Sequence, residues 1–339
     1  MAKSGQRKPT SFDVARLAGV SRSAVSRAFT PGGTIAPMTR EKVAKAASEL
    51  GYRVNSLARG LQKNHSGIVG LVASRLDTPL RSRQVRLLSE ALTREGLKPM
   101  LITAERPDNV GSLIESLLGY SIAGMIFTSD SPTRALIEDC GRFGLPVVLV
   151  NRAGITNWGD RVVADNEVAG QLAAQILIES GATRLACLVP RDGTFSVSGR
   201  ATAFVGAAKR QGFRAELFYS ADQSYEDARA EINALGPSVI GRLDGLFCAT
   251  DLMALGALDA LRFDLGLTVP DRIQVLGFDD IEQAGWASYD LSTIRQDIAT
   301  QTKTVVRLLI ERIADSTLAN RVERQPLEIV LRGTTRHDR

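Results

Sequence analysis

The chain has 339 residues, of which 44% are hydrophobic and 23% are charged, so it can form more than one domain with a sizeable core. It has no run of about 18 apolar residues that would span a membrane and no apolar signal segment near its start, so we expect a cytoplasmic protein. Because it has only two histidines and three widely separated cysteines, we expect no metal site, no cofactor and no His-based catalysis, and buried thiols at Cys140, Cys187 and Cys248.

The net charge of +5 is unevenly divided along the chain. Residues 1–65 contain twelve Lys or Arg and three Asp or Glu, a net charge of +9, so the other 274 residues carry −4. A basic module joined to a slightly acidic one indicates attraction to a phosphate backbone at one end and a different task at the other. A solvated basic arm is the alternative explanation of the charge alone.

Residues 11–29, SFDVARLAGVSRSAVSRAF, predict two short helices joined by a tight turn. Val14 and Leu17 lie on one face of the first helix, Gly19 permits the turn, and Ser21 can cap the second helix. The second helix would then bury Ala24, Val25 and Ala28, and it would expose Arg22, Ser23, Ser26 and Arg27. This pattern is typical of a helix-turn-helix.

A third helix follows in the segment PMTREKVAKAASELG, with Val43, Ala46, Ala47 and Leu50 at helical spacing. A recognition helix presents its first residues to base edges, where Arg makes two hydrogen bonds to guanine and Ser pairs with several bases. The whole unit with its charge therefore predicts DNA binding. A purely structural helical hairpin is the alternative.

From residue 68 onward, apolar strand-like runs alternate with helical patterns, which indicates an α/β fold of parallel sheets covered by helices. The series is roughly doubled and predicts two similar lobes. RVVADNEV, near residues 161–168, is the expected first crossing between them. A strand LSTIRQD, a long helix IATQTKTVVRLLIERIA and a last strand LEIVLRG make the return crossings.

Polar residues follow several predicted strands of this body: Thr128 and Ser129, Asn151 and Arg152, Asp251, and Asp279 and Asp280. Because small molecules bind at the C-terminal ends of strands in open α/β sheets, these side chains predict a ligand cleft. Two of them have plainer alternatives. Asp251 is equally an N-cap for the helix LMALGAL, and Asp280 is equally a solvated turn residue.

DVARLAGVSRSAVSRAF, TREKVAKAASELGYRVNSLARGL and the α/β body together resemble the lactose and galactose repressor family of bacterial transcription regulators. The resemblance covers about residues 9–335. It implies a three-helix DNA-binding domain (1–54), a hinge helix and linker (55–65), and a two-lobed body like the periplasmic binding proteins (66–339). The first lobe would hold about 66–165 and 297–322, and the second about 166–296 and 323–335.

The resemblance also assigns DNA contacts by position. Arg22 and Ser23 match the family's base-reading positions, Arg27 matches a third DNA contact, and the polar positions near phosphates are matched by Thr10, Ser21 and Ser26. Residues 55–61 match the hinge helix, in which Asn55 is the first residue, Ala58 and Leu61 match minor-groove contacts, and Leu61 is the wedge between base pairs. A leucine packed on the body is the alternative for Leu61.

In the cleft, Arg200, expected at the start of the helix GRATAF, matches the family's effector-binding arginine, and Asp279 matches the acid that binds sugar hydroxyls. Asn151 and Thr128 match first-lobe contacts, and Gln296 lies near the crossover. With Asp251, these residues form the expected effector site.

Several positions depart from the family pattern. In the N-terminal part, Val54 replaces a common proline, Gly60 lies inside the hinge helix, and Ala36 replaces a common serine cap of the third helix. In the cleft, Gln223 aligns with an aromatic residue that stacks on sugars in many relatives, and Tyr225 lies two positions on. Thr78, Leu80 and Arg81 lie where the family usually has residues of an Asn-Pro-Phe-Phe segment. Arg81 either adds a cation that suits an acidic or phosphorylated effector or faces solvent.

The sequence therefore predicts a sequence-specific transcriptional repressor that binds a palindromic operator as a homodimer. A small polar effector, a sugar or a related metabolite, would control it allosterically. The helix over residues 83–96 is expected in the dimer interface. A periplasmic ligand-binding protein would need a secretory leader. An enzyme would need a phosphate-binding loop or a nucleophile motif, and the chain has neither a G-x-x-x-x-G-K-S/T nor a G-x-S-x-G segment.

Overall fold

The computed structural model describes residues 9–29, 32–52, 66–103, 121–128, 134–152 and 158–336. The chain divides into two compact units, Met1–Ser66 and Gly67–Arg339. The hinge segment, residues 55–65, lies outside the described residues.

The N-terminal unit contains three helices, α1 (Ser11–Ala18), α2 (Arg22–Phe29) and α3 (Pro37–Leu50), as the sequence predicts. All three contribute to one core of small and branched side chains, which consists of Val14, Ala15, Val25, Ala28, Val43, Ala46 and Ala47. The core is small but continuous, so the exposed faces of the helices have a defined orientation.

The ends of α1 and α2 are fixed by local hydrogen bonds. The backbone N–H and the hydroxyl of Thr10 donate to Asp13 Oδ2 at 2.8 and 2.7 Å. Gly19 has φ of 65°, a left-handed conformation that ends α1 at low cost. Ser21 Oγ accepts a hydrogen bond from the N–H of Ala24 at 3.2 Å, so its expected role as a cap of α2 is confirmed.

The prediction that Ala24 is buried is wrong, and Leu17, which was predicted to share a face with Val14, lies outside the core. Leu17 is 50% exposed and Ala24 is half-buried. The buried face of α1 is centred between Val14 and Ala15, and Leu17 lies about 110° around the helix from that centre at about 100° per residue. Leu17, three positions after Val14, therefore lies at the edge of the apolar stripe rather than inside it.

The first lobe of the body is built on a six-stranded sheet with the order β11-β5-β4-β3-β1-β2, in which all paired strands run parallel. Its elements are β1 (Ile68–Ala73), α5 (Pro79–Arg94), β2 (Lys98–Thr103), β3 (Gly124–Phe127), α7 (Arg134–Arg142), β4 (Val147–Val150), β5 (Asp160–Ala164), α12 (Ile298–Ala314) and β11 (Val322–Gln325). α5 begins four residues before the expected residue 83, because Pro79 occupies its first position.

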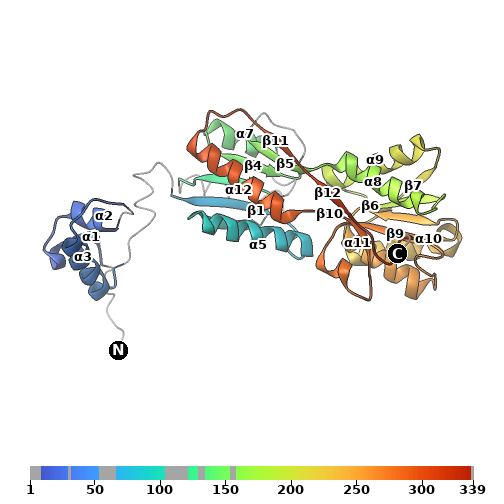
Figure 1. Cartoon of the computed structure of the whole chain (residues 1–339), viewed down its shortest axis with the longest axis horizontal. Coiled ribbons are helices and arrows are strands. Elements are labelled where there is room, and N and C mark those ends of the chain that lie inside the picture. Colours follow the sequence, from blue (N-terminus) through green and yellow to red (C-terminus); the bar gives the residue numbers. More distant parts are fainter. Residues whose placement is uncertain are drawn as a thin grey trace. The chain divides into compact units, whose positions relative to one another are not determined.

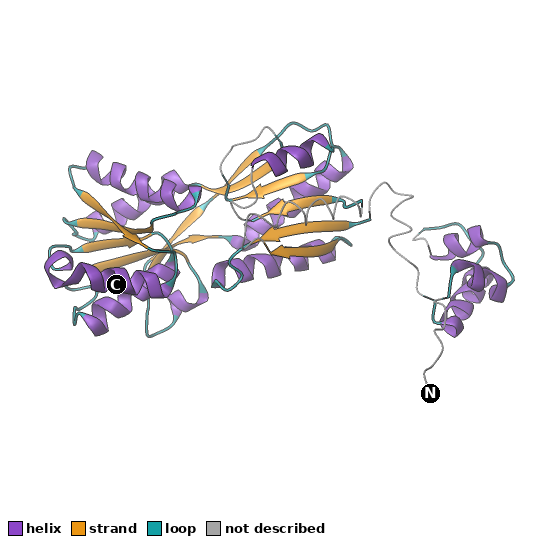
Figure 2. Ribbon diagram, turned by 180° about the vertical axis from the view of Figure 1, so that it is seen from behind, coloured by secondary structure: helices purple, strands orange, loops and turns teal. Residues whose placement is uncertain are grey.

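The second lobe has a six-stranded sheet with the order β12-β10-β9-β8-β6-β7, parallel except for the β10–β12 pair. Its elements are α8 (Asn166–Glu179), β6 (Leu185–Pro190), α9 (Phe195–Arg210), β7 (Ala215–Ser220), α10 (Tyr225–Ile240), β8 (Gly245–Cys248), α11 (Asp251–Asp259), a π-helical turn (Ala260–Asp264), β9 (Gln274–Asp279), a 3-10 turn (Glu282–Gly285), β10 (Ser292–Gln296) and β12 (Leu327–Val330). Figure 2 shows the strands of each lobe between layers of helices.

The chain crosses between the lobes after β5, after β10 and between β11 and β12 (Figure 1). The last crossing differs from the prediction, which placed residues 323–335 in the second lobe. β11 pairs with β5 in the first sheet, so Val322–Gln325 belong to the first lobe and the crossing falls at Pro326. β11 was not predicted because its segment VERQ contains only one apolar residue. A strand at the edge of a sheet can form with few apolar residues.

Each sheet is covered by buried apolar side chains on both faces, which form two clusters in each lobe. Cys140, Cys187 and Cys248 are free thiols inside these clusters, so the prediction of buried thiols is confirmed. Burial raises the pKa of Cys140 to about 11. These thiols are therefore core residues rather than reactive groups.

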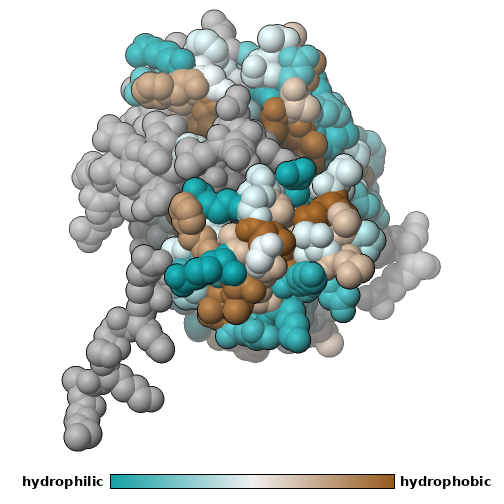
Figure 3. All heavy atoms as spheres, turned by 90° about the vertical axis from the view of Figure 1, so that its left-hand side faces the viewer, coloured by the Kyte–Doolittle hydropathy of each residue, from teal (hydrophilic) through white to brown (hydrophobic). Residues whose placement is uncertain are grey.

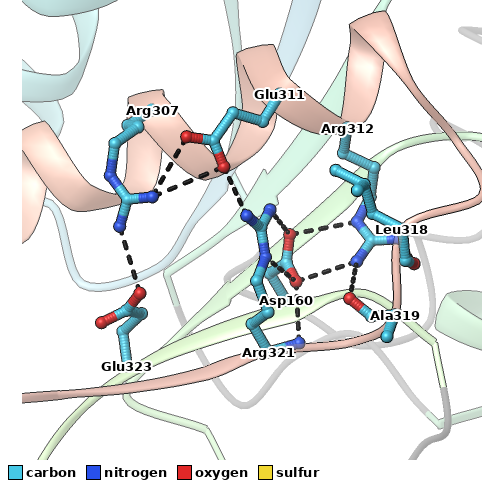
Figure 4. A network of polar contacts seen from close by, with 8 residues as sticks. All are labelled: Asp160, Arg307, Glu311, Arg312, Leu318, Ala319, Arg321 and Glu323. Carbon is cyan, nitrogen blue, oxygen red and sulfur yellow. Dashed lines mark hydrogen bonds and ion pairs between the residues drawn. The ribbon is translucent and has the colours of Figure 1, made fainter.

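A buried carboxylate joins the end of α12 to β5 (Figure 4). Asp160 is fully buried and accepts hydrogen bonds from Arg312 Nε and Nη2 at 3.0 and 2.8 Å. It also accepts from the N–H, Nε and Nη2 of Arg321 at 2.9, 3.2 and 2.9 Å. Burial alone would raise the pKa of Asp160, but the bonds from these two arginines outweigh it and lower the pKa.

Candidate nucleic-acid interface and ligand pocket

The candidate nucleic-acid interface is the exposed face of α2. Val25 and Ala28 point into the three-helix core. The predicted DNA-contacting residues of this segment are all exposed: Ser21, Arg22, Ser23, Ser26 and Arg27. One helix thus divides its apolar and polar residues between the core and the surface.

The side chains on this face contact one another. Arg27 Nε donates to the carbonyl of Ser23 at 3.3 Å, and its Nη2 donates to the Ser23 hydroxyl at 3.4 Å. The hydroxyls of Ser21 and Ser23 are 2.8 Å apart. These are weak, exposed contacts that DNA groups can replace.

Arg22 makes a contact that the sequence did not reveal. Its guanidinium carbon lies 4.1 Å from the centre of the Phe12 ring, and Phe12 is 61% exposed. A cation–π contact at an exposed site is worth only about 0.5 to 1 kcal/mol, so Arg22 can leave the ring to reach a base. Phe12 and Arg22 are ten positions apart on different helices, so no helical spacing signals the pair.

The other predicted DNA contacts are Thr10, at the start of α1, and the three hinge residues. Thr10 is half-buried and its hydroxyl is used at the start of α1, where it donates to Asp13. Asn55, Ala58 and Leu61 lie outside the described residues, as do Val54 and Gly60. Their roles stay predictions.

On the face of the molecule shown in Figure 3, hydrophobic residues lie in small groups among hydrophilic ones. Within the described residues, none of the helices combines the length and the apolarity that crossing a membrane requires.

A ligand pocket lies between the two lobes of the body, at the C-terminal ends of both sheets. The first lobe lines it with Ser74, Arg75, Thr78, Pro79, Leu80, Arg81, Thr128 and Asn151. The second lobe contributes Thr194, Ser196, Val197, Arg200, Gln223, Thr250, Leu252, Asp279, Ile281 and Gln296. Five of the six predicted effector residues are therefore brought together, and Asp251 is not among them.

Arg200 projects into this pocket from the second lobe. The sequence predicted that Arg200 begins a helix, and this is wrong. α9 begins at Phe195, after the N-cap Thr194, so Arg200 lies inside it. A Cβ at Gly170 would lie 2.3 Å from the Arg200 carbonyl, so a glycine there lets α8 and α9 pack closely. This close packing fixes where the Arg200 side chain leaves the helix.

The guanidinium of Arg200 is buried and only partly bonded. Nε donates to Asn166 Oδ1 at 3.2 Å, Nη1 donates to the Ala249 carbonyl at 2.5 Å, and the group lies 3.7 Å from the centre of the Phe278 ring. Burial lowers its pKa to about 10, although Asp279 partly offsets this. Among the described residues, Nη2 has no hydrogen-bond partner, so its two N–H groups remain for a ligand.

Asp279, at the end of β9, provides an acceptor in the same pocket. Its Oδ1 accepts from Gln296 Nε2 at 2.6 Å. Burial raises its pKa to about 6, against the attraction of Arg200 and the bond from Gln296. Arg200 and Asp279 together can donate to and accept from neighbouring hydroxyls.

Asn151 connects the two lobes beneath the pocket. Its Nδ2 donates to Gln296 Oε1 at 3.2 Å, and its backbone carbonyl accepts from the Ser196 hydroxyl at 2.9 Å. Its Oδ1 accepts from the N–H of Ala164 at 2.8 Å, and Asn151 has φ of 52°, which asparagine tolerates. Thr128, by contrast, donates its hydroxyl to the Val72 carbonyl at 3.1 Å within the first lobe.

Two acidic residues do not have the roles that the sequence suggested. Asp251 is fully buried behind the pocket, where it accepts from the hydroxyl of Thr293 at 2.6 Å and from the N–H of Ile281 at 2.9 Å. It is not the N-cap of α11 either, since Thr250 occupies that position. Asp280 is no solvated turn residue, because it pairs with Arg295 and Arg332 at 2.7 Å each.

The structure adds pocket residues that the sequence did not indicate. Arg75, just after β1, forms an ion pair with Asp222 of the second lobe and so bridges the mouth of the cleft. Serine and threonine side chains at strand ends also line it, but such residues are common in turns and give little signal. Tyr225 is not a lining residue; its hydroxyl donates to Asp259 at 2.6 Å.

No group of three or more His, Cys, Asp or Glu in the described parts of the chain is placed to hold a metal ion. The described pocket residues offer hydrogen-bond donors, hydrogen-bond acceptors and charge to a ligand.

Comparison with known proteins gives matches over both units. A family model described as "Bacterial regulatory proteins, lacI family" matches residues 12–55, and one described as "Periplasmic binding protein-like domain" matches residues 174–335. The chain is 31% identical to the HTH-type transcriptional regulator reg1 of Streptomyces lividans, over 95% of each chain. It is 30% identical to the sucrose operon repressor of Pediococcus pentosaceus, over 91% of this chain and 94% of the relative.

Among solved structures, the lac repressor dimer bound to operator and the anti-inducer ONPF has a TM-score of 0.86 and 25% identity, over 97% of this chain and 99% of that chain. Both the helical module and the two-lobed body thus have counterparts in single relatives of the same length.

Proposed function

Because the chain belongs to the lacI family of bacterial regulatory proteins, we propose that it is a transcriptional repressor that binds a specific operator in double-stranded DNA. It binds a palindromic site as a homodimer, acts in the cytoplasm and catalyses no reaction. A small polar effector, a sugar or a related metabolite, binds between the lobes and changes the affinity for the operator.

The observation that carries this proposal is the exposed face of α2. Arg22, Ser23 and Arg27 lie on it, while the opposite side of the helix is anchored in the core. Arginine at the start of a helix is suited to guanine in the major groove. The operator-bound lac repressor and the sucrose operon repressor share nearly the whole length of this chain, which supports the same role for this helix.

A series of hydrogen bonds supports control by a ligand in the pocket. Arg81 donates to Gln84 at 2.6 Å, Gln84 donates to Gln301 at 2.6 Å, and Gln301 donates to Asn151 at 3.5 Å. Asn151 continues the series to Gln296 in the second lobe. Movement of one lobe against the other therefore changes bonds that reach both α5 and α12.

The dimer interface that we propose includes α5 and its neighbour β2. β2 is the edge strand of the first sheet, and it leaves Met100 and Leu101 37% and 46% exposed. Exposed apolar residues on a sheet edge favour a protein contact. A pair of α5 helices at this interface would transmit lobe movement to the two DNA-binding units.

Selection of duplexes from a random DNA pool by the full-length protein tests the proposal. We expect a two-fold-symmetric site and an affinity that falls steeply with salt. Arg22→Ala should weaken binding to that site by about 1 to 3 kcal/mol and relax the preference at one base pair of each half-site. Arg142→Ala, an exposed arginine on α7, serves as the control and should change neither. Enrichment of no site would contradict the proposal.

A further inference from the structure

Resting on the proposed function, we infer that the effector is a small polyhydroxylated anion, a sugar acid or a sugar phosphate. Its negative group faces the arginines of the first lobe, and its hydroxyls face Arg200 and Asp279 of the second. Four observations on the pocket carry this inference.

The first is the charge of the pocket wall. Three guanidinium groups line it, those of Arg75, Arg81 and Arg200, and Asp279 is the one carboxylate among the described lining residues. Asp222 pairs with Arg75 from outside the lining. A wall with this excess of positive charge favours an anion over a neutral molecule.

The second is the direction of three helices. α5, α9 and α11 all begin at the pocket, and their N-caps Thr78, Thr194 and Thr250 line it. The N-terminus of a helix carries partial positive charge and free N–H groups. Three such ends around one cavity reinforce the field of the arginines.

The third is the absence of a ring for stacking. The apolar lining residues that the structure describes are aliphatic: Pro79, Leu80, Val197, Leu252 and Ile281. Gln223, which departs from the sugar-stacking aromatic residue of the family, lines the pocket, and the hydroxyl of the nearby Tyr225 donates to Asp259. Affinity for a neutral sugar through its apolar face therefore has little support here.

The fourth is the state of Arg200, which is 5% exposed. Its Nε and Nη1 are bonded within the protein, whereas its Nη2 has no hydrogen-bond partner among the described residues and is available to a ligand. The carboxylate of Asp279 is itself shared with Gln296. A ligand with adjacent oxygens satisfies both groups, and Arg75 and Arg81 line the first-lobe side of the same pocket.

Isothermal titration calorimetry on the full-length protein tests this inference with matched compounds. Gluconate and glucuronate represent the sugar acids, glucose 6-phosphate and fructose 1-phosphate represent the sugar phosphates, and glucose and fructose are the neutral counterparts. We expect at least one anion to bind about tenfold or more tightly than its neutral counterpart, and to shift operator affinity. Tighter binding of the sugar acids would identify a carboxylate as the negative group of the effector, and tighter binding of the sugar phosphates would identify a phosphate. Neutral sugars that bind as tightly as every anion, or no binding by any anion, would overturn the inference.

Variants of one arginine locate the charge. Arg81→Gln should weaken binding of the anion about tenfold, and Arg81→Lys should retain part of the affinity. Arg142→Gln is the control, since Arg142 is exposed on α7, away from the proposed dimer interface, and does not line the pocket. Equal affinity of Arg81→Gln and wild type would overturn the assignment of the anion to the first lobe.

Operator selection on the ligand-free protein separates this inference from the proposed function. If a site is enriched while every anion fails to bind, the effector class is wrong and the regulator stands. If an anion binds while no site is enriched, the regulator is wrong and the pocket assignment stands.

Discussion

Each lobe of the body contains a cluster of buried charge, and the two clusters are balanced in opposite ways. In the first lobe, Asp160 lies between two arginines that bond both of its oxygens, and its pKa is lowered. In the second lobe, one arginine, Arg200, interacts with two acids, Asp279 and Asp251. Burial raises the pKa of Asp251 to about 8 and that of Asp279 to about 6, and it lowers the pKa of Arg200 to about 10. The charged forms of all three groups in the second lobe, Asp251, Asp279 and Arg200, are therefore less favourably surrounded than the charged form of Asp160 in the first.

The difference separates a structural cluster from a binding site. Around Asp160, the charges are matched and the bonds complete, so the cluster fixes the end of α12 against β5 (Figure 4). In the pocket wall, Arg200 retains unbonded donors. Buried charge with incomplete bonding costs stability that a ligand can restore.

The largest expected effect is that of Asp160→Asn. Arginine cannot release its proton near neutral pH, so the buried Arg312 would be left as an uncompensated cation, while Arg321 would keep its ion pair with Glu311. We expect the free energy of unfolding to fall by about 3 to 5 kcal/mol in urea titrations. Since the pKa of Asp160 is lowered, its stabilising contribution is full above the ordinary value of 3.8 and is lost as the pH falls below it.

Asp264→Asn provides the control for that experiment. Asp264 also accepts two bonds from one arginine, Arg229, at 2.7 Å each, but the pair is on the surface. We expect no measurable loss, because exposed ion pairs contribute little. Equal losses for both variants would show that burial of the Asp160 cluster is unimportant.

Asp251→Asn should change the pH dependence of stability in the opposite direction. The folded chain holds the Asp251 proton up to a pKa of about 8, whereas the unfolded chain releases it near 3.8. Stability from this group is therefore full below pH 3.8 and is lost as the pH rises toward 8. Between about pH 5 and pH 8, we expect the free energy of unfolding of the variant to decline by about 1 to 3 kcal/mol less than that of the wild type. Urea titrations at three pH values measure it, and an unchanged slope would contradict the prediction.

Arg200→Met should separate stability from binding. Asp279 can take up a proton when Arg200 is removed, so no uncompensated charge remains, in contrast to the arginines beside Asp160. We expect the free energy of unfolding to change by about 1 kcal/mol or less, while the effector no longer alters operator affinity. Thermal unfolding and operator titrations check the two parts. A loss as large as that of Asp160→Asn would remove the distinction between the clusters.

Much of the fold could be predicted because its signals are local. Apolar runs such as IVGLVA and VVLV are strands buried on both faces, and Gly19 and Ser21 set the ends of helices through backbone geometry. β11 was missed because its partner, β5, lies about 160 positions earlier in the chain, and only that pairing makes VERQ a strand. The exposure of Leu17 could not be predicted because the period of a helix does not show where its apolar stripe ends.

The candidate site was predictable where position in the fold decides it. Thr128, Asn151, Asp279 and Gln296 follow strands or lie at their ends, and they line the pocket. Asp251 shares that position, but its side chain turns to Thr293 and the N–H of Ile281. Which way an acidic side chain turns depends on hydrogen-bond donors from other strands, and the sequence does not bring these together.

The smallest expected effect concerns a charge that is not buried at all. The contact of Arg22 with Phe12 is worth about 0.5 to 1 kcal/mol. Phe12→Leu should remove it and release Arg22 for the DNA, so we expect affinity for the selected operator to rise about two- to fivefold. Phe263→Leu, at an exposed phenylalanine of the body, is the control and should leave the affinity unchanged. A fall in affinity for Phe12→Leu would show instead that the ring holds Arg22 in its DNA-binding orientation, so that even an exposed cation in this protein depends on a fixed partner.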